Sequence, residues 1–164
     1  MQVFENQARP EARLLRAVGR ARVRRRAWLA TRGLGALSLL AVGAVHLQQY
    51  LMLYSAIPTI GTLFVLNFAG ATAIGVGLLA PVEHLFGRFG SVAVMLLSVG
   101  GMVLAASAFV FLLVSERTPL FGFMEPGYDP PALMAARASE LAAAGLLGAF
   151  LAGRVERRMR VGRW

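Results

Sequence analysis

Four long apolar segments, separated by short polar or proline-containing stretches, constrain this chain more than any other feature. They cover residues 33–53, 59–80, 91–114 and 132–153. Each is long enough to cross a bilayer as a helix, which takes about 20 mainly apolar residues. Of the 164 residues only 15% are charged, against about 25% in soluble domains. The sequence therefore predicts an all-α fold, a four-helix transmembrane bundle with a basic N-terminal interfacial helix.

Residues beside these segments predict where the helices begin and end. Pro58 lies just before the second segment, where its missing N–H costs no helical hydrogen bond, and Pro81 follows as a stop. Ser91 is expected to cap the third helix, and Asp129 precedes the fourth. We expect three regions: a basic cytoplasmic arm (1–32), a membrane domain (33–153) and a basic cytoplasmic tail (154–164).

The arginines predict the orientation. All 17 basic residues are arginine: nine precede the first segment, five follow the last, and Arg88 lies between the second and third. The opposite side has only Arg117, with Arg137 inside the fourth segment. The positive-inside rule then places both termini in the cytoplasm of a bacterial plasma membrane. Alternatively, Arg25 and Arg26 could belong to a twin-arginine export signal, although the apolar stretch continues through Met52.

The arm predicts contact with lipid. Leu14, Leu15, Val18 and Ala21 fall near one helical face between arginines, as in a helix lying on the inner leaflet. Anionic lipids attract each such arginine by about 1 kcal/mol. A nucleic-acid partner is disfavoured because aromatic residues are not interleaved with the arginines, and docking to an acidic protein is an alternative. The predicted lipid-surface residues are Arg22, Arg24, Arg25, Arg26 and Trp28.

Each apolar segment carries one polar residue at a similar depth. At 1.5 Å per residue, His46, Asn67, Ser107 and Glu140 all lie roughly 12–13 Å below the outer surface. Small residues that repeat on the same helical faces, such as Ala71 and Gly75, are typical of surfaces where membrane helices pack. We therefore predict a polar layer inside the outer half of the bundle.

Other polar residues lie just outward of this layer. Gln49 and Tyr50 follow His46 at helical spacing, and Arg137 lies one turn from Glu140, with which it could pair. Without a charged partner Glu140 is expected to hold its proton; with one it could ionise. The layer is interpreted either as interhelical hydrogen bonding or as a ligand or proton site. The candidate ligand- or proton-binding residues are His46, Gln49, Tyr50, Asn67, Ser107, Arg137 and Glu140.

The two longer loops carry different signals. Residues 115–131 include Phe121, Phe123 and Tyr128, which are interpreted as aromatic anchors at the interface or as a lid over the polar layer. Between the second and third segments, Glu83 and His84 are adjacent in sequence and do not share a helical face. They are expected to be solvated.

Several kinds of chemistry are disfavoured by composition. The chain has no cysteine and two histidines, which leaves no thiolate metal site and little for a histidine centre. Phosphate-binding, zinc-protease and serine-hydrolase motifs do not occur. We therefore predict no metal, no catalytic residue, no enzyme activity and no cofactor, with haem or quinone left open. A hydrolytic combination of Ser107, His46 and Glu140 is a minor alternative.

One stretch carries a family resemblance. His46-Leu47-Gln48-Gln49-Tyr50, followed by an Ile-Pro-Thr-Ile-Gly turn at 57–61 and Leu-Phe-Val-Leu-Asn at 63–67, resembles a segment of an uncharacterised four-span membrane protein family of actinobacteria. The resemblance implies a bacterial plasma membrane and carries no activity.

The leading interpretation of the sequence is a non-enzymatic accessory or scaffold subunit, which packs against itself or a larger membrane complex. It rests on the missing catalytic motifs and on the small-residue packing faces. The alternative is a proton- or ion-coupled small-molecule transporter that uses Glu140. A second alternative is a quinone- or haem-associated redox protein that uses His46.

Overall fold

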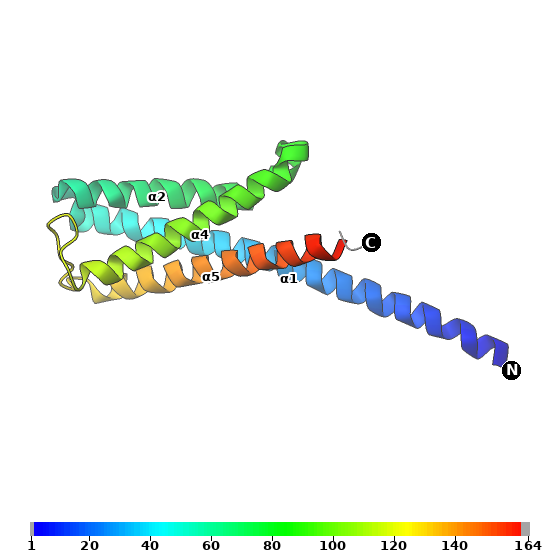
Figure 1. Cartoon of the computed structure of the whole chain (residues 1–164). Coiled ribbons are helices and arrows are strands. Elements are labelled where there is room, and N and C mark those ends of the chain that lie inside the picture. Colours follow the sequence, from blue (N-terminus) through cyan, green and yellow to red (C-terminus); the bar gives the residue numbers. More distant parts are fainter. Residues whose placement is uncertain (1, 162–164) are drawn as a thin grey trace. The chain divides into compact units, whose positions relative to one another are not determined.

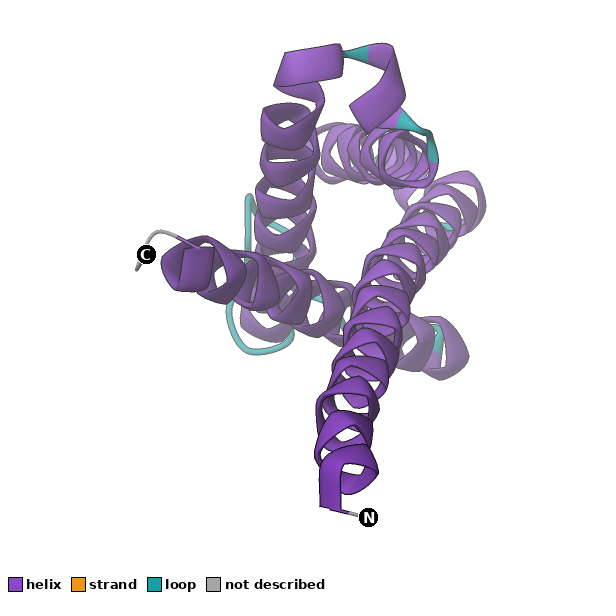
Figure 2. Ribbon diagram, turned by 90° about the vertical axis from the view of Figure 1, so that its right-hand side faces the viewer, coloured by secondary structure: helices purple, strands orange, loops and turns teal. Residues whose placement is uncertain are grey.

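The computed structural model describes the backbone of residues 2–161 and the side chains of residues 18–20, 22–24, 26–156 and 159. The described chain is mainly helical, with no named strand and with one longer loop over residues 116–129 (Figures 1 and 2). Four long helices are α1 (Gln2–Met52), α2 (Pro58–Leu79), α4 (Gly90–Ser115) and α5 (Pro130–Val161). Short turns connect them: η1 (Tyr54–Ala56), α3 (Val82–Leu85) and η2 (Gly87–Phe89).

The chain divides into two compact units, Met1–Ala30 and Thr31–Trp164. The first is helical as predicted, but its helix is assigned without a break into the first apolar segment, so no separate arm helix ends near residue 32. Arg22, Arg24 and Arg26 are exposed and Trp28 is half-buried. The side chains of Leu14, Leu15, Ala21 and Arg25 lie outside the described residues, and contact of the arm with lipid stays a prediction.

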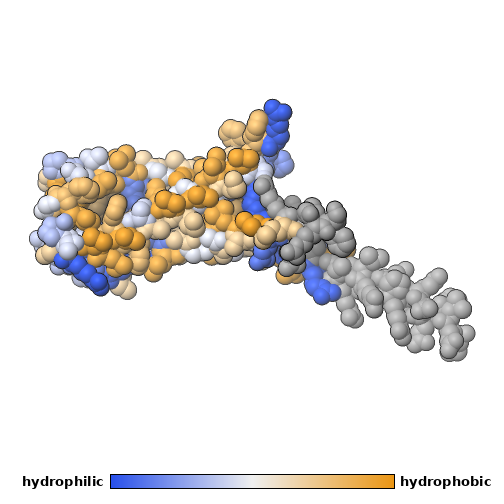
Figure 3. Space-filling model, in the orientation of Figure 1, coloured by the Kyte–Doolittle hydropathy of each residue, from blue (hydrophilic) through white to orange (hydrophobic). Residues whose placement is uncertain are grey.

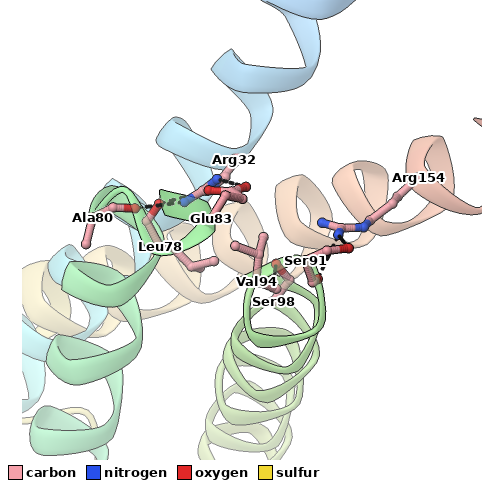
Figure 4. Close-up of polar contacts among 8 residues, drawn as sticks. All are labelled: Arg32, Leu78, Ala80, Glu83, Ser91, Val94, Ser98 and Arg154. Atoms are coloured by element: carbon pink, nitrogen blue, oxygen red, sulfur yellow. Dashed lines mark hydrogen bonds and ion pairs between the residues drawn. The ribbon is translucent and has the colours of Figure 1, made fainter. Parts of the chain in front are cut away.

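All four predicted spans lie in helices long and apolar enough to cross a membrane. On the face shown in Figure 3, hydrophobic side chains cover most of the middle of the bundle and hydrophilic ones gather toward its ends. The second helix begins at Pro58. The prediction that Ser91 caps the third helix is wrong: α4 begins at Gly90 without a side-chain cap, and Ser91 instead accepts hydrogen bonds from Arg154 (Figure 4).

The helices of the second unit pack through small residues. α4 packs against both α2 and α5. Residues of α1 contact both α2 and α5, because Gly75 makes room for Leu40 and Gly35 makes room for Leu147. A Cβ atom added to Gly101 of α4 would lie 2.6 Å from Leu39 Cδ1, closer than carbon atoms approach. These glycines allow the close helix approach that membrane bundles use in place of the hydrophobic effect.

The two ends of this bundle are held by different contacts. At the end formed by α3 and η2, here the Arg32 end, Arg32 Nε donates to Leu78 O (2.8 Å) and Nη2 to Ala80 O (3.0 Å). Its Nη1 donates to Glu83 Oε1 at 2.6 Å (Figure 4). Arg32 thus satisfies backbone carbonyls at the end of α2, which have no helical partner.

Glu83 is therefore not simply solvated, as the sequence predicted, while His84 is exposed. Partial burial by itself would raise the pKa of Glu83, but the hydrogen bond and charge of Arg32 outweigh it and hold that pKa below its ordinary value. The opposite end of the bundle consists of η1 and the loop of residues 116–129. We call it the long-loop end.

Candidate ligand site

A cavity of about 130 Å³ lies among the helices toward the long-loop end. All four long helices, η1 and the loop contribute to its walls, which are mainly aliphatic and aromatic. An apolar cavity with a small number of polar groups is the usual form of a small-molecule site. The polar lining residues are His46, Gln49, Tyr54, Asn67, Ser115, Glu125, Asp129 and Glu140.

His46 of α1 and Glu140 of α5 meet deep in the helical part of the lining. His46 Nδ1 lies 2.9 Å from Val42 O, so Nδ1–H donates to the backbone and Nε2 is free to face the cavity. Nε2 lies 3.8 Å from Glu140 Oε1, which is too far for a hydrogen bond. The Glu140 side chain is only 1% exposed. A carboxyl group is thus held inside the bundle beside one imidazole.

Two oxygen atoms at this place have no hydrogen-bond partner in the described structure: Glu140 Oε2 and Asn67 Oδ1. Both atoms are buried, and both residues line the cavity. Buried polar atoms in proteins nearly always have a partner, and an exception calls for a specific reason. These two oxygens are available to a bound molecule.

The other polar lining groups near the loop are bonded to one another. Tyr54 donates its hydroxyl hydrogen to Glu125, and Gln49 Nε2 donates to Asp129 Oδ2 at 2.9 Å. Asp129 Oδ1 also accepts the N–H of Ala132 at 3.1 Å, which caps the N-terminus of α5. Burial, together with the hydrogen bond to Glu125, raises the pKa of the Tyr54 hydroxyl above its ordinary range. These bonds attach the loop to α1, η1 and α5.

Aromatic rings form one wall of the cavity. The ring centroids of His46 and Phe64 are 5.1 Å apart, and those of Phe64 and Tyr54 are 4.7 Å apart in a stacked arrangement. Phe123 meets Tyr54 edge-on at 5.5 Å. Phe123 reaches this position through a tight turn in which Phe121 and Gly122 both have positive φ, a geometry of two-residue hairpins. The row of rings runs from Phe123 in the loop to His46 beside Glu140.

The structure brings part of the predicted polar layer together. His46, Gln49, Asn67 and Glu140 line the cavity. Ser107 does not line it, because its hydroxyl donates to Val103 O and Leu104 O of its own helix. The layer is thus formed by three of the four long helices, and no Ser107–His46–Glu140 combination is assembled.

Two other predicted site residues lie elsewhere. Arg137 pairs with Glu116 and not with Glu140. Tyr50 borders a separate surface hollow beside Pro58 and Gly61. Tyr50 on α1 and Arg137 on α5, each one helical turn from a lining residue, therefore do not line the cavity toward which the sequence placed them.

Sequence reasoning did not include Tyr54, Glu125, Asp129 or Phe64 in the site. Of the two loop acids, only Asp129 entered the sequence predictions, as the residue that precedes the fourth helix. The available signal was the unusual composition of the loop, in which two carboxylates lie four residues apart among aromatic residues. Within the described residues, no group of three or more histidine or acidic side chains could hold a metal ion.

Comparisons with protein-family models, curated proteins and solved structures found no match for this chain. The function therefore has to be argued from the cavity and its lining.

Proposed function

We propose that the protein is a proton-coupled small-molecule transporter of a bacterial plasma membrane, and that the cavity beside Glu140 is its binding site. The observation that carries the proposal is the buried carboxyl group with an unpartnered oxygen at a cavity wall. Ionisable residues inside membrane segments are costly and typically mark ion, proton or substrate pathways. The expected orientation, with both termini in the cytoplasm, places the long-loop end outside.

The cavity favours ligand binding over a purely structural role for the polar residues. Interhelical hydrogen bonds that fix register need partners, but Glu140 and Asn67 each keep an oxygen without one. The cavity volume of about 130 Å³ is close to that of an engineered apolar cavity of roughly 150 Å³ that binds benzene. A molecule with one ring or a comparable alkyl body fits this space.

Coupling to protons follows from the position of Glu140. A bound molecule and a proton compete for the same carboxyl group, and His46 Nε2 at 3.8 Å is the nearest titratable neighbour for that proton. Arg137 does not neutralise Glu140, because it is paired with Glu116. Binding and protonation are therefore linked at one side chain.

The test uses proteoliposomes loaded with a pH-sensitive dye. Benzamidinium, benzamide and benzoate share one shape and differ in charge, and each is added outside while proton movement is recorded. Protein-free vesicles correct for passive permeation. We expect at least one compound to move protons in wild-type vesicles but not in Glu140→Gln vesicles.

Glu156→Gln is the matched control, because Glu156 is an exposed residue of the same helix. It should behave like the wild type. If none of the three compounds moves protons above the protein-free level, or if Glu140→Gln vesicles match the wild type, the transporter proposal is wrong.

The accessory-subunit interpretation remains a second candidate because of one observation. Gly145 is exposed on α5, and apart from its chain neighbours and the nearby backbone of α5 no described heavy atom lies within 4 Å of the place where its Cβ would be. Small residues of this kind permit close contact with another membrane helix. A second membrane protein should then copurify with the wild type and be lost when Gly145 is replaced with leucine. Purification of the wild type without any second protein would contradict this candidate. The redox alternative stays a prediction from the sequence.

A further inference from the structure

We infer that the molecule bound in the cavity is a small organic cation, an ammonium, amidinium or guanidinium group attached to an aromatic or alkyl body. This inference rests on the proposed function and specifies its substrate class. Three independent properties of the lining support it: its charge, the hydrogen-bonding character of its open atoms, and its aromatic wall.

The lining is acidic. Glu125, Asp129 and Glu140 contribute carboxyl groups, and among the described residues no arginine contributes to the cavity wall. The nearest arginine on α5, Arg137, is paired with Glu116 outside the lining. Among the side chains that the structure describes, His46 is the only basic one in the wall. In a low-dielectric site such a lining attracts a cation and repels an anion.

The fully buried polar atoms of the lining that lack a partner are hydrogen-bond acceptors. Glu140 Oε2 and Asn67 Oδ1 have no partner, and His46 Nε2 accepts when Nδ1–H donates to Val42 O. Two donors of the lining are already engaged, since Tyr54 donates to Glu125 and Gln49 donates to Asp129. A bound molecule must therefore supply N–H or O–H donors near Glu140. A carboxylate offers acceptors only, and a neutral amide offers N–H donors without a positive charge.

The aromatic wall suits the body of such a cation. Tyr54 and Phe64 are stacked 4.7 Å apart, and Phe123 continues the wall toward the loop. Rings attract cations through their negative faces when the charge lies within about 6 Å of the centroid. They also provide apolar contact for a ring-sized body. The row of rings ends at His46, which lies beside Glu140. A cation whose body contacts the rings can therefore place its charged group near Glu140.

The exchange balances in protons and charge. The protonated carboxyl of Glu140 releases one proton, through His46 or to water, and the resulting carboxylate accepts N–H bonds from the incoming cation. One positive charge enters the site and one leaves. In the described part of the chain, the titratable groups that face Glu140 are His46 on α1 and, farther along the lining, Tyr54, Glu125 and Asp129. The lining residues that the structure describes on α2 and α4 include no titratable side chain.

The experiment measures binding of the same three probes by calorimetry to the full chain in lipid nanodiscs. Benzamidinium should bind at least tenfold more tightly than benzamide or benzoate. Glu140→Gln keeps the shape of the side chain and removes its charge, and it should weaken benzamidinium binding at least tenfold. Glu156→Gln should bind like the wild type.

The selectivity of the wild type tests the inference even if Glu140→Gln does not fold. Binding of benzamide or benzoate as tight as that of benzamidinium would overturn the cation class. If either of those compounds also moved protons through Glu140 in vesicles, the proposed function would stand and only the substrate class would be wrong. If no probe bound and no proton moved, both proposals would fail.

Discussion

A side chain that fills the cavity should stabilise the protein and at the same time prevent ligand binding. Ala136 lies one turn from Glu140 on α5, is buried, and lines the cavity. Engineered cavities destabilise proteins by about 24 cal/mol per Å³, so the present 130 Å³ corresponds to roughly 3 kcal/mol when nothing fills it. Ala136→Leu adds three carbon atoms to this space. It should recover part of that energy and at the same time exclude the ligand.

The measurement is thermal unfolding in detergent together with benzamidinium binding. A gain of 1 kcal/mol raises the melting temperature of a protein of this size by roughly 2–4 °C, so we expect a rise of that order and at least a tenfold loss of binding. Ala135→Leu is the matched control, because Ala135 is exposed, and it should change neither. A lower melting temperature for Ala136→Leu would show that the site is already packed, and unchanged binding would show that the ligand lies elsewhere.

Three further predictions concern the polar contacts that hold the two ends of the bundle. Arg32→Ala leaves the Leu78 and Ala80 carbonyls without their charged donor and should lower the free energy of unfolding by roughly 3 kcal/mol or more; a loss below 1 kcal/mol on thermal unfolding would refute this role. The pKa of Glu83 is lowered in the folded state, so its contribution to stability is present above its unfolded-state pKa of 4.5 and should fall as the pH drops below 4.5. The Glu83→Gln variant should therefore lose less stability than the wild type over this acid range. Because the pKa of Tyr54 is raised by burial and by Glu125, its contribution is present below pH 10 and should decline above it; an alkaline unfolding curve unchanged in Tyr54→Phe would contradict this.

The four long apolar helices could be predicted from the sequence because length and apolar composition suffice for that conclusion. The four expected segments match the four long helices, except that the first two segments end one residue beyond α1 and α2. Pro58 and Asp129 stand at helix starts as expected. Depth along each helix was also informative, since 1.5 Å per residue places His46 and Glu140 at one level, and the structure brings them within 3.8 Å.

Rotation of the helices and long-range pairing could not be predicted. The buried face of α5 follows Ala136, Glu140, Ala143, Leu147 and Phe150. The small residues spaced every fourth position after Glu140 are not part of it: Ala144 and Gly148 are half-buried and Ala152 is exposed. Helices with nearly uniform hydrophobicity give little signal for the face that packs inward, because lipid and protein interior are equally apolar.

The acidic partners of the arginines could not be predicted either. Arg137 has one acid a single turn away on its own helix and another in a distant loop, and it pairs with the distant Glu116. Arg32 likewise finds Glu83 across 51 positions of sequence. Helical spacing identifies only neighbours on the same helix. Both ion pairs instead depend on how the connections that carry Glu116 and Glu83 are placed against the helices.

The most direct test of proton-linked binding at Glu140 is the number of protons released when the ligand binds. Benzamidinium binding to the wild type is measured by calorimetry in two buffers that differ in their enthalpy of protonation. The proposed exchange predicts that about one proton is released per molecule bound, and that this release is absent in Glu140→Gln. Binding of benzamidinium without proton release, or with the same release in Glu140→Gln, would contradict it.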